Sequence, residues 1–102
     1  MIIVLATIEI ADGRRDDFLA EFHKVVPLVR DEVGCIEYGP TVDAVTNIEK
    51  QDPCRHNTVV VVEKWESLDA LNDHLVAPHM GSYRESVADM VAGMSLQVLE
   101  PA

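Results

Sequence analysis

The residues best suited to chemistry are concentrated in residues 63–83, EKWESLDALNDHLVAPHMGSY. This stretch holds the only tryptophan, Trp65, two of the four histidines, His74 and His79, and one of the two tyrosines, Tyr83. Histidine exchanges protons near neutral pH, and aromatic side chains line apolar pockets. The stretch therefore allows three interpretations, namely a metal site, a catalytic pocket or the packed inner wall of a small domain.

The spacing of these residues argues against a metal site. Pro78 separates His74 from His79, so the two rings do not share one helix face as the histidines of an H-E-x-x-H motif do. No third ligand has a suitable spacing, and Cys35 and Cys54 fit neither a C-x-x-C nor a zinc-ligand pattern. We therefore predict no metal site and two unpaired thiols.

A catalytic pocket needs a group that transfers protons and an apolar wall. His79 follows Pro78, where a helix restarts, and His74 lies between Leu71 and Leu75 at the edge of an apolar stripe. Either histidine is a candidate for proton transfer with a bound molecule. The candidates for contact with that molecule are Trp65, Tyr83, Met80 and Tyr38. Packing in the core is the alternative interpretation of each of these six side chains.

The surrounding pattern predicts the elements that position these residues. The segments 2–10 and 58–65 are β-branched and apolar at successive positions, as in strands that are buried on both faces. Between them, apolar residues recur every three or four positions, which indicates an amphipathic helix. The expected elements are a strand over 2–10, a helix over 14–33 capped by Asp12, kinked at Pro27 and ended by Gly34, strands over 35–45 and 58–65, a helix that begins at Ser67 and is interrupted at Pro78, and a strand over 94–100. The polar stretch 46–57 is either a lid or an arm that reaches a partner subunit.

This order, β-α-β-β-α-β, predicts an α+β fold of the ferredoxin-like type, with a four-stranded antiparallel sheet and the helices on one face. The first and third strands are nevertheless apolar on both faces. The face without helices would expose a large apolar patch, which monomers rarely tolerate. We therefore predict a homodimer in which two sheets pack through their open faces, a dimeric α/β barrel.

Charge and length restrict the partners and the organisation. The chain has 18 acidic and 8 basic residues, a net charge of −10, and its basic residues are scattered. Nucleic acids and anionic membranes are bound by clustered Lys and Arg, so we predict neither partner. The first residues, MIIVLATIEI, carry no basic leader and are too few to span a bilayer, which favours the cytoplasm. At 102 residues without repeats or linkers, the chain is expected to form a single domain over 1–102.

Two segments resemble the antibiotic biosynthesis monooxygenase (ABM) family. The segment DEVGCIEY at 31–38 contains the family pattern E-x-G-C-x-x-Y, and 63–80 contains E-x-W followed by a helix and two histidines. The matching residues are Glu32, Gly34, Cys35, Tyr38, Glu63, Trp65, His74 and His79. The resemblance follows the order and spacing of almost the whole chain, and it implies the same dimeric α/β barrel.

The resemblance also implies an activity. Quinol monooxygenase-like members oxidise electron-rich hydroxyaromatics with molecular oxygen and use neither metal nor flavin. On this basis we expect a small aromatic substrate, molecular oxygen, no cofactor, and proton transfer by His79 or His74. The positions that haem-degrading relatives require carry Thr7, His74 and Arg84 instead, which argues against haem degradation. Two alternatives stay open: an isomerase of a small enolisable ketone, which needs the same histidine but no oxygen, and a non-enzymatic dimeric binding or stress-response module.

Overall fold

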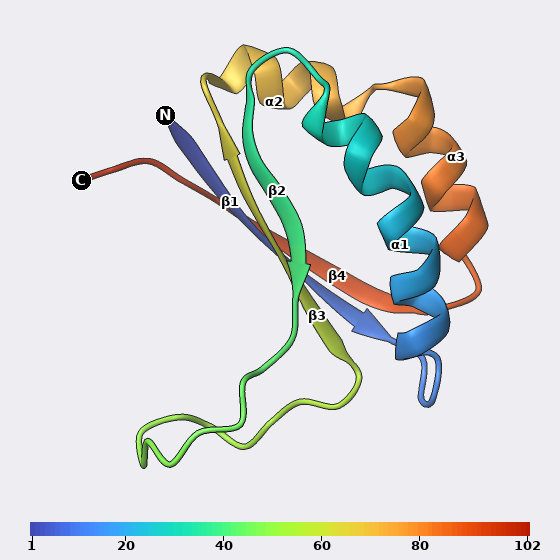
Figure 1. Ribbon diagram of the computed structural model, residues 1–102, viewed down its shortest axis with the longest axis vertical. Coiled ribbons are helices and arrows are strands. Elements are labelled where there is room, and N and C mark those ends of the chain that lie inside the picture. Colours follow the sequence, from blue (N-terminus) through green and yellow to red (C-terminus); the bar gives the residue numbers. More distant parts are fainter.

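The computed structural model describes residues 1–102 and contains four strands and three helices (Figure 1). In chain order these are β1 (Ile2–Ile10), α1 (Arg15–Arg30), β2 (Cys35–Thr41), β3 (Thr58–Trp65), α2 (Leu68–Leu75), α3 (Pro78–Val87) and β4 (Val91–Leu99). The predicted ferredoxin-like order is confirmed, with the last helical region divided into α2 and α3. None of the three helices combines the length and the apolar composition needed to cross a membrane.

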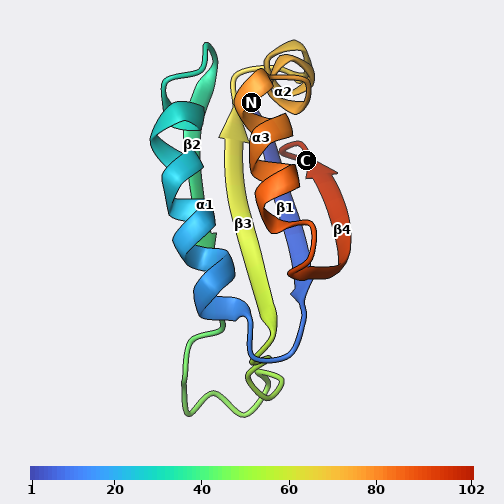
Figure 2. The ribbon, with the colours of Figure 1, turned by 90° about the vertical axis from the view of Figure 1, so that its right-hand side faces the viewer.

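The four strands form one antiparallel sheet in the order β2-β3-β1-β4. All three helices lie on one face of this sheet, with α1 in front of β2 and α3 in front of its middle (Figure 2). The residues of β1 that are buried under the helices are Ile2, Val4, Ala6, Ile8 and Ile10. No helix lies in front of β4 (Figure 2), so Met94 and Leu96 remain exposed on the same face, opposite Ile8 and Ala6.

The opposite face of the sheet has no helix and is apolar at its centre. Successive side chains of a strand point to opposite faces, so the residues between the buried ones belong here. The apolar residues of this open face are Ile3, Leu5, Val60, Val62 and Leu99. Leu5 pairs with Val62 and Ile3 with Leu99, so the set forms one continuous patch across β3, β1 and β4.

The start of α1 differs from the expectation. Arg14 occupies the N-cap position without a side-chain cap. Asp12, the predicted cap, instead accepts a hydrogen bond from Nδ2 of Asn57 at 3.1 Å. This bond ties the turn after β1 to the segment that leads into β3, and Asp12 lies two residues before the N-cap position.

The turn after α1 places Glu32 close to α2. The helix ends at Arg30, three residues before the predicted end, because the chain has to turn toward β2. Gly34 then adopts φ +84°, and its carbonyl accepts a hydrogen bond from the N–H of Glu66 at 2.8 Å. A Cβ atom at this position would lie 2.5 Å from Cβ of Ala70. Only glycine allows both the backbone conformation and this close approach to α2.

The break between α2 and α3 follows the sequence prediction. Oγ of Ser67 accepts a hydrogen bond from the N–H of Ala70 at 3.2 Å and caps α2. Pro78 begins α3, where its missing N–H removes no helical hydrogen bond. The break brings the last turn of α2, with His74, beside the first turn of α3, with His79.

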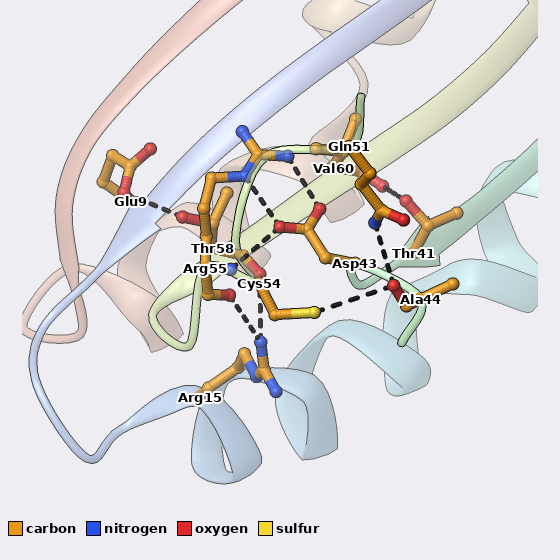
Figure 3. A network of polar contacts seen from close by, with 10 residues as sticks. All are labelled: Glu9, Arg15, Thr41, Asp43, Ala44, Gln51, Cys54, Arg55, Thr58 and Val60. Carbon is orange, nitrogen blue, oxygen red and sulfur yellow. Dashed lines mark hydrogen bonds and ion pairs between the residues drawn. The ribbon is translucent and has the colours of Figure 1, made fainter. Parts of the chain in front are cut away.

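The segment 42–57 forms an arm that extends beyond the sheet (Figure 1). Nε and Nη2 of Arg55 donate to the two carboxylate oxygens of Asp43 at 2.9 and 2.8 Å (Figure 3), and these hydrogen bonds lower the pKa of Asp43. Nη1 of Arg15 in α1 donates to the carbonyl of Arg55 at 3.1 Å and holds the base of the arm. Val45, at 92% exposure, projects from the arm into solvent. No residue of the arm lines the cavity described below.

Candidate functional site

An apolar cavity of about 310 Å³ lies between the sheet and helices α2 and α3. Its wall includes Ala6, Met80, Val87, Met94 and Leu96, so it reaches the part of β4 that no helix covers. Apart from Tyr38 and Tyr83, its only polar lining residues are Glu63, His74 and Arg84. Proton transfer with a molecule in this cavity is therefore confined to very few side chains.

Glu63 and His74 lie side by side in the cavity wall. They are 5% and 1% exposed, respectively. Nε2 of His74 is 3.9 Å from Oε1 of Glu63, which is too long for a hydrogen bond but allows one oxygen atom to hydrogen-bond to both. The indole Nε1–H of Trp65 donates to the same Oε1 at 2.9 Å, and the Trp65 and His74 ring centroids are 4.6 Å apart. The tryptophan thus fixes the position of the Glu63 carboxyl group in the cavity wall.

Glu32 connects His74 with His79. Oε2 of Glu32 lies 2.9 Å from Nδ1 of His74 and 2.8 Å from Nε2 of His79. A carboxylate can only accept hydrogen bonds, so both ring nitrogens donate when Glu32 is ionised. In a neutral His74 this leaves Nε2, on the side of Glu63, as an acceptor. The ring is therefore oriented to take a proton from the cavity.

Burial is the main cause of the pKa shifts of the ionisable side chains in the cavity wall. It raises the pKa of Glu63 to about 7, against the smaller opposite effect of the Trp65 hydrogen bond. Burial also lowers the pKa of His74, and the hydrogen bond with Glu32 acts in the opposite direction. The pKa values of Tyr38 and Tyr83 are raised well above their ordinary range by burial, so both hydroxyls stay protonated. Glu63 changes its charge near neutral pH, which is the range in which a general base is useful.

The comparisons with known proteins agree with this architecture. The model of the family described as "Antibiotic biosynthesis monooxygenase" (ABM) matches residues 1–86. The chain belongs to the ABM family. The protein described as "Probable quinol monooxygenase YgiN" from Escherichia coli strain K12 is 37% identical to this ABM chain over 103 residues, which cover 99% of this chain and 98% of the relative. A protein of the same description from Shigella flexneri matches with the same figures.

Solved structures show the same ABM fold. PA3566 from Pseudomonas aeruginosa superposes with a TM-score of 0.80 at 21% identity and covers 99% of this chain and 93% of its own. Rv0793 from Mycobacterium tuberculosis gives a TM-score of 0.80 at 24% identity, with 99% and 94% of the two chains covered. At these identities the likeness concerns the fold alone.

The structure brings four of the six predicted site residues of this ABM chain to the cavity. These are His74, Tyr38, Met80 and Tyr83. Trp65 is fully buried and does not line the cavity, but it supports two residues that do, since it donates to Glu63 and packs against the ring of His74. The ring of His79 does not line the cavity but a separate surface hollow, and it reaches His74 through Glu32.

Sequence reasoning missed two acidic residues as parts of the site. In the sequence, Glu32 and Glu63 stand out only as positions of the ABM pattern, whereas the structure places them on either side of His74. Arg84 is exposed but also lines the cavity, and its Nη2 donates to the carbonyl of Leu75 at 2.9 Å. The signal available in the sequence was that Glu63 is the one charged residue on the buried face of β3, which it shares with Val59, Val61 and Trp65. No group of three or more His, Cys, Asp or Glu side chains is arranged to hold a metal ion.

Proposed function

We propose that this protein is a monooxygenase that oxidises a small quinol-like hydroxyaromatic with molecular oxygen, without metal or flavin. The observation that carries the proposal is the apolar cavity of about 310 Å³ with Glu63 and His74 as neighbouring proton acceptors in its wall. This volume is at the lower end of the range for small-molecule sites. The 37% identity to a protein described as a quinol monooxygenase supports the substrate class.

In this reaction the protein has to bind the quinol, remove a proton from one of its hydroxyls and shield the resulting anion from solvent. A substrate hydroxyl placed between Nε2 of His74 and Oε1 of Glu63 gives its proton to His74, and the resulting anion is a stronger reductant. The quinol supplies all the electrons that oxygen needs. One oxygen atom enters the ring to give a hydroxyquinone, and the other leaves as water. The apolar wall, with Tyr38, Met80 and Tyr83 around the ring, excludes solvent from the anion.

The functional unit in this proposal is a homodimer joined through the open sheet face. The support is the continuous apolar patch of β1, β3 and β4, in which Leu5 and Leu99 are each 37% exposed in the single chain. Packing two such faces together would remove this apolar area from water. The cavity lies on the other face of each sheet, so both sites stay accessible in the dimer.

Oxygen uptake tests the proposal. Metal-stripped protein is supplied with a panel of reduced benzo-, naphtho- and anthraquinols, and the rate is corrected for autoxidation. We expect uptake that depends on the protein and falls by about 100-fold in His74→Gln, because general-base catalysis contributes a factor of this size. His23→Gln, on the exposed side of α1, is the matched control and keeps the full rate. No uptake above autoxidation across the panel would contradict the proposal.

The same protein preparation distinguishes the two alternatives. Exchange of solvent deuterium into a small ketone without oxygen would indicate an isomerase that uses the same His74. Binding of hydroxyaromatics without turnover or exchange would indicate a binding module. Neither result is expected if the substrate anion is formed for reaction with oxygen.

A further inference from the structure

The buried proton acceptor in the cavity is linked to a histidine at the surface. His74 is 1% exposed, whereas the His79 side chain is 24% exposed. The two rings are bridged by a single oxygen atom, Oε2 of Glu32, at 2.9 and 2.8 Å. The His74 ring packs against Trp65 and Tyr38. A proton that His74 takes from the cavity therefore cannot pass directly from the ring to bulk solvent.

The bridge restricts the charge that the pair can carry. One carboxylate oxygen accepts from both rings, and it can balance one positive charge but not two. A second imidazolium beside the first would add repulsion in a buried environment, where charges interact strongly. Protonation of one ring therefore favours loss of a proton from the other.

The other ionisable groups near the rings do not remove this restriction. Those that face His74 are Glu63, Tyr38 and Arg84, and those that line the hollow of His79 are Glu21, Lys24 and Tyr83. Nζ of Lys24 is held by Oε1 of Glu21 at 2.9 Å, so this pair contributes no net charge to the hollow. Glu32 is the only carboxylate that hydrogen-bonds to either ring.

We propose that His74 and His79 form a linked proton-release pair, in which uptake of a proton by His74 from the cavity expels a proton from His79 to solvent across the shared Oε2 of Glu32. In this step His79 begins as an imidazolium and His74 as a neutral imidazole: Nε2 of His74 gains the substrate proton, and Nδ1 of His79 gives its proton to water or buffer, which leaves His79 neutral with its Nε2–H on Glu32. Glu32 keeps both N–H donors throughout, so it is a positioning residue. This inference rests on the proposed function for its substrate proton, but the link between the rings can be measured without a substrate.

The first test is a pH titration of protein labelled with ¹⁵N in its histidine rings, followed by NMR. In His79→Gln, which keeps an N–H donor toward Glu32, we expect the midpoint of His74 to rise by about one pH unit, because a competing positive charge is removed. His23→Gln should leave that midpoint unchanged. An unchanged midpoint in a folded His79→Gln protein, checked by its melting temperature, would overturn the proposal.

The second test uses turnover. In His79→Ala we expect kcat for quinol oxidation to fall about tenfold in dilute buffer and to recover with added imidazole, with little change in KM. Wild-type kcat should not respond to imidazole. If the wild-type protein and His79→Ala have equal kcat values in dilute buffer, the linked pair is overturned and the proposed function is left intact. A shifted His74 midpoint in a protein that consumes no oxygen with any quinol would support the pair and refute the proposed function.

Discussion

Trp65 and Glu63 face the same side of β3, and the indole Nε1–H donates to Oε1 of the carboxyl group at 2.9 Å. Both side chains are buried, at 0% and 5% exposure. Because two residues separated by one position share a strand face, the E-x-W pattern creates this bond locally, without help from the rest of the fold. The tryptophan is therefore the support of an acidic group in the cavity wall.

Replacing Trp65 with Phe should disturb that acidic group as well as the packing. The carboxyl group of Glu63 loses its donor, so we expect its pKa to rise further above its wild-type value, which titration of the labelled carboxyl by ¹³C NMR would measure. We also expect the free energy of unfolding to fall by about 2 kcal/mol, from lost contacts and an unpaired buried acceptor. A double variant with Glu63→Gln gives the coupling between the two residues. An unchanged Glu63 titration would show that the bond has no electrostatic role.

Glu63 should make the stability of the protein depend on pH. Its pKa in the folded protein, about 7, lies above the ordinary 4.5 because burial disfavours the charged form. The contribution of Glu63 to the free energy of unfolding is therefore greatest below pH 4.5 and is lost as the pH rises from there through 7, by about 3 kcal/mol in total. Glu63→Gln, which cannot ionise, should lack this loss. Urea denaturation at pH 5 and pH 8 measures it, and a parallel decline in both proteins would contradict the assignment.

A larger side chain at Ala6, on β1, should block the cavity. Ala6 lines the cavity, and Ala6→Leu would place an isobutyl group there in place of a methyl group. We expect at least about tenfold weaker binding of a naphthol-type ligand, measured by calorimetry, with little loss of stability because the group fills existing space. Ala20→Leu makes the same chemical change at an exposed position of α1 and should bind normally. Equal affinity of the two variants would place the ligand elsewhere.

The fold could be predicted from the sequence because its signals are local. Strand β1 carries apolar residues on both of its faces, and this pattern predicted a sheet that is apolar on both sides. The structure then places Val4 on the face under the helices and Leu5 on the open face. Ser67 and Pro78 marked the limits of the helices α2 and α3 in the same way. The end of α1 was misplaced because the apolar spacing continues to Val33, whereas the turn that begins after Arg30 depends on contact with α2.

The candidate site was only partly predictable, because its decisive contacts join distant segments. Glu32 is separated from His74 by 42 residues and from His79 by 47, and nothing local selects it among 18 acidic residues. The different positions of the two rings, one in the cavity and one at a surface hollow, depend on how α2 and α3 meet at Pro78. Residue type predicted that these histidines could transfer protons, but only the tertiary structure assigns them different surroundings.

The open sheet face should control the oligomeric state. Leu5 lies at the centre of the apolar patch, so Leu5→Lys would place two charges in the proposed interface, one from each subunit. We expect the wild-type protein to be a dimer in light scattering and the variant to be a monomer, with the dissociation constant raised at least about 100-fold. Val76→Lys introduces the same charge at a residue that is 80% exposed outside this face and should remain dimeric. A dimeric Leu5→Lys protein would place the interface elsewhere.

Gly34 should be required for the position of Glu32. Gly34→Ala strains a backbone at φ +84° and brings the new Cβ atom to 2.5 Å from Cβ of Ala70, so α2 must move away from the turn. We expect a loss of more than about 2 kcal/mol in urea denaturation, together with an altered His74 titration. Gly13→Ala is the matched control, since its φ is +74° but no atom lies within 4 Å of the added Cβ, and it should cost only about 1 kcal/mol. Similar losses in the two variants would mean that the contact with Ala70 relaxes freely, and that α2 does not depend on Gly34 to hold His74 against Glu32.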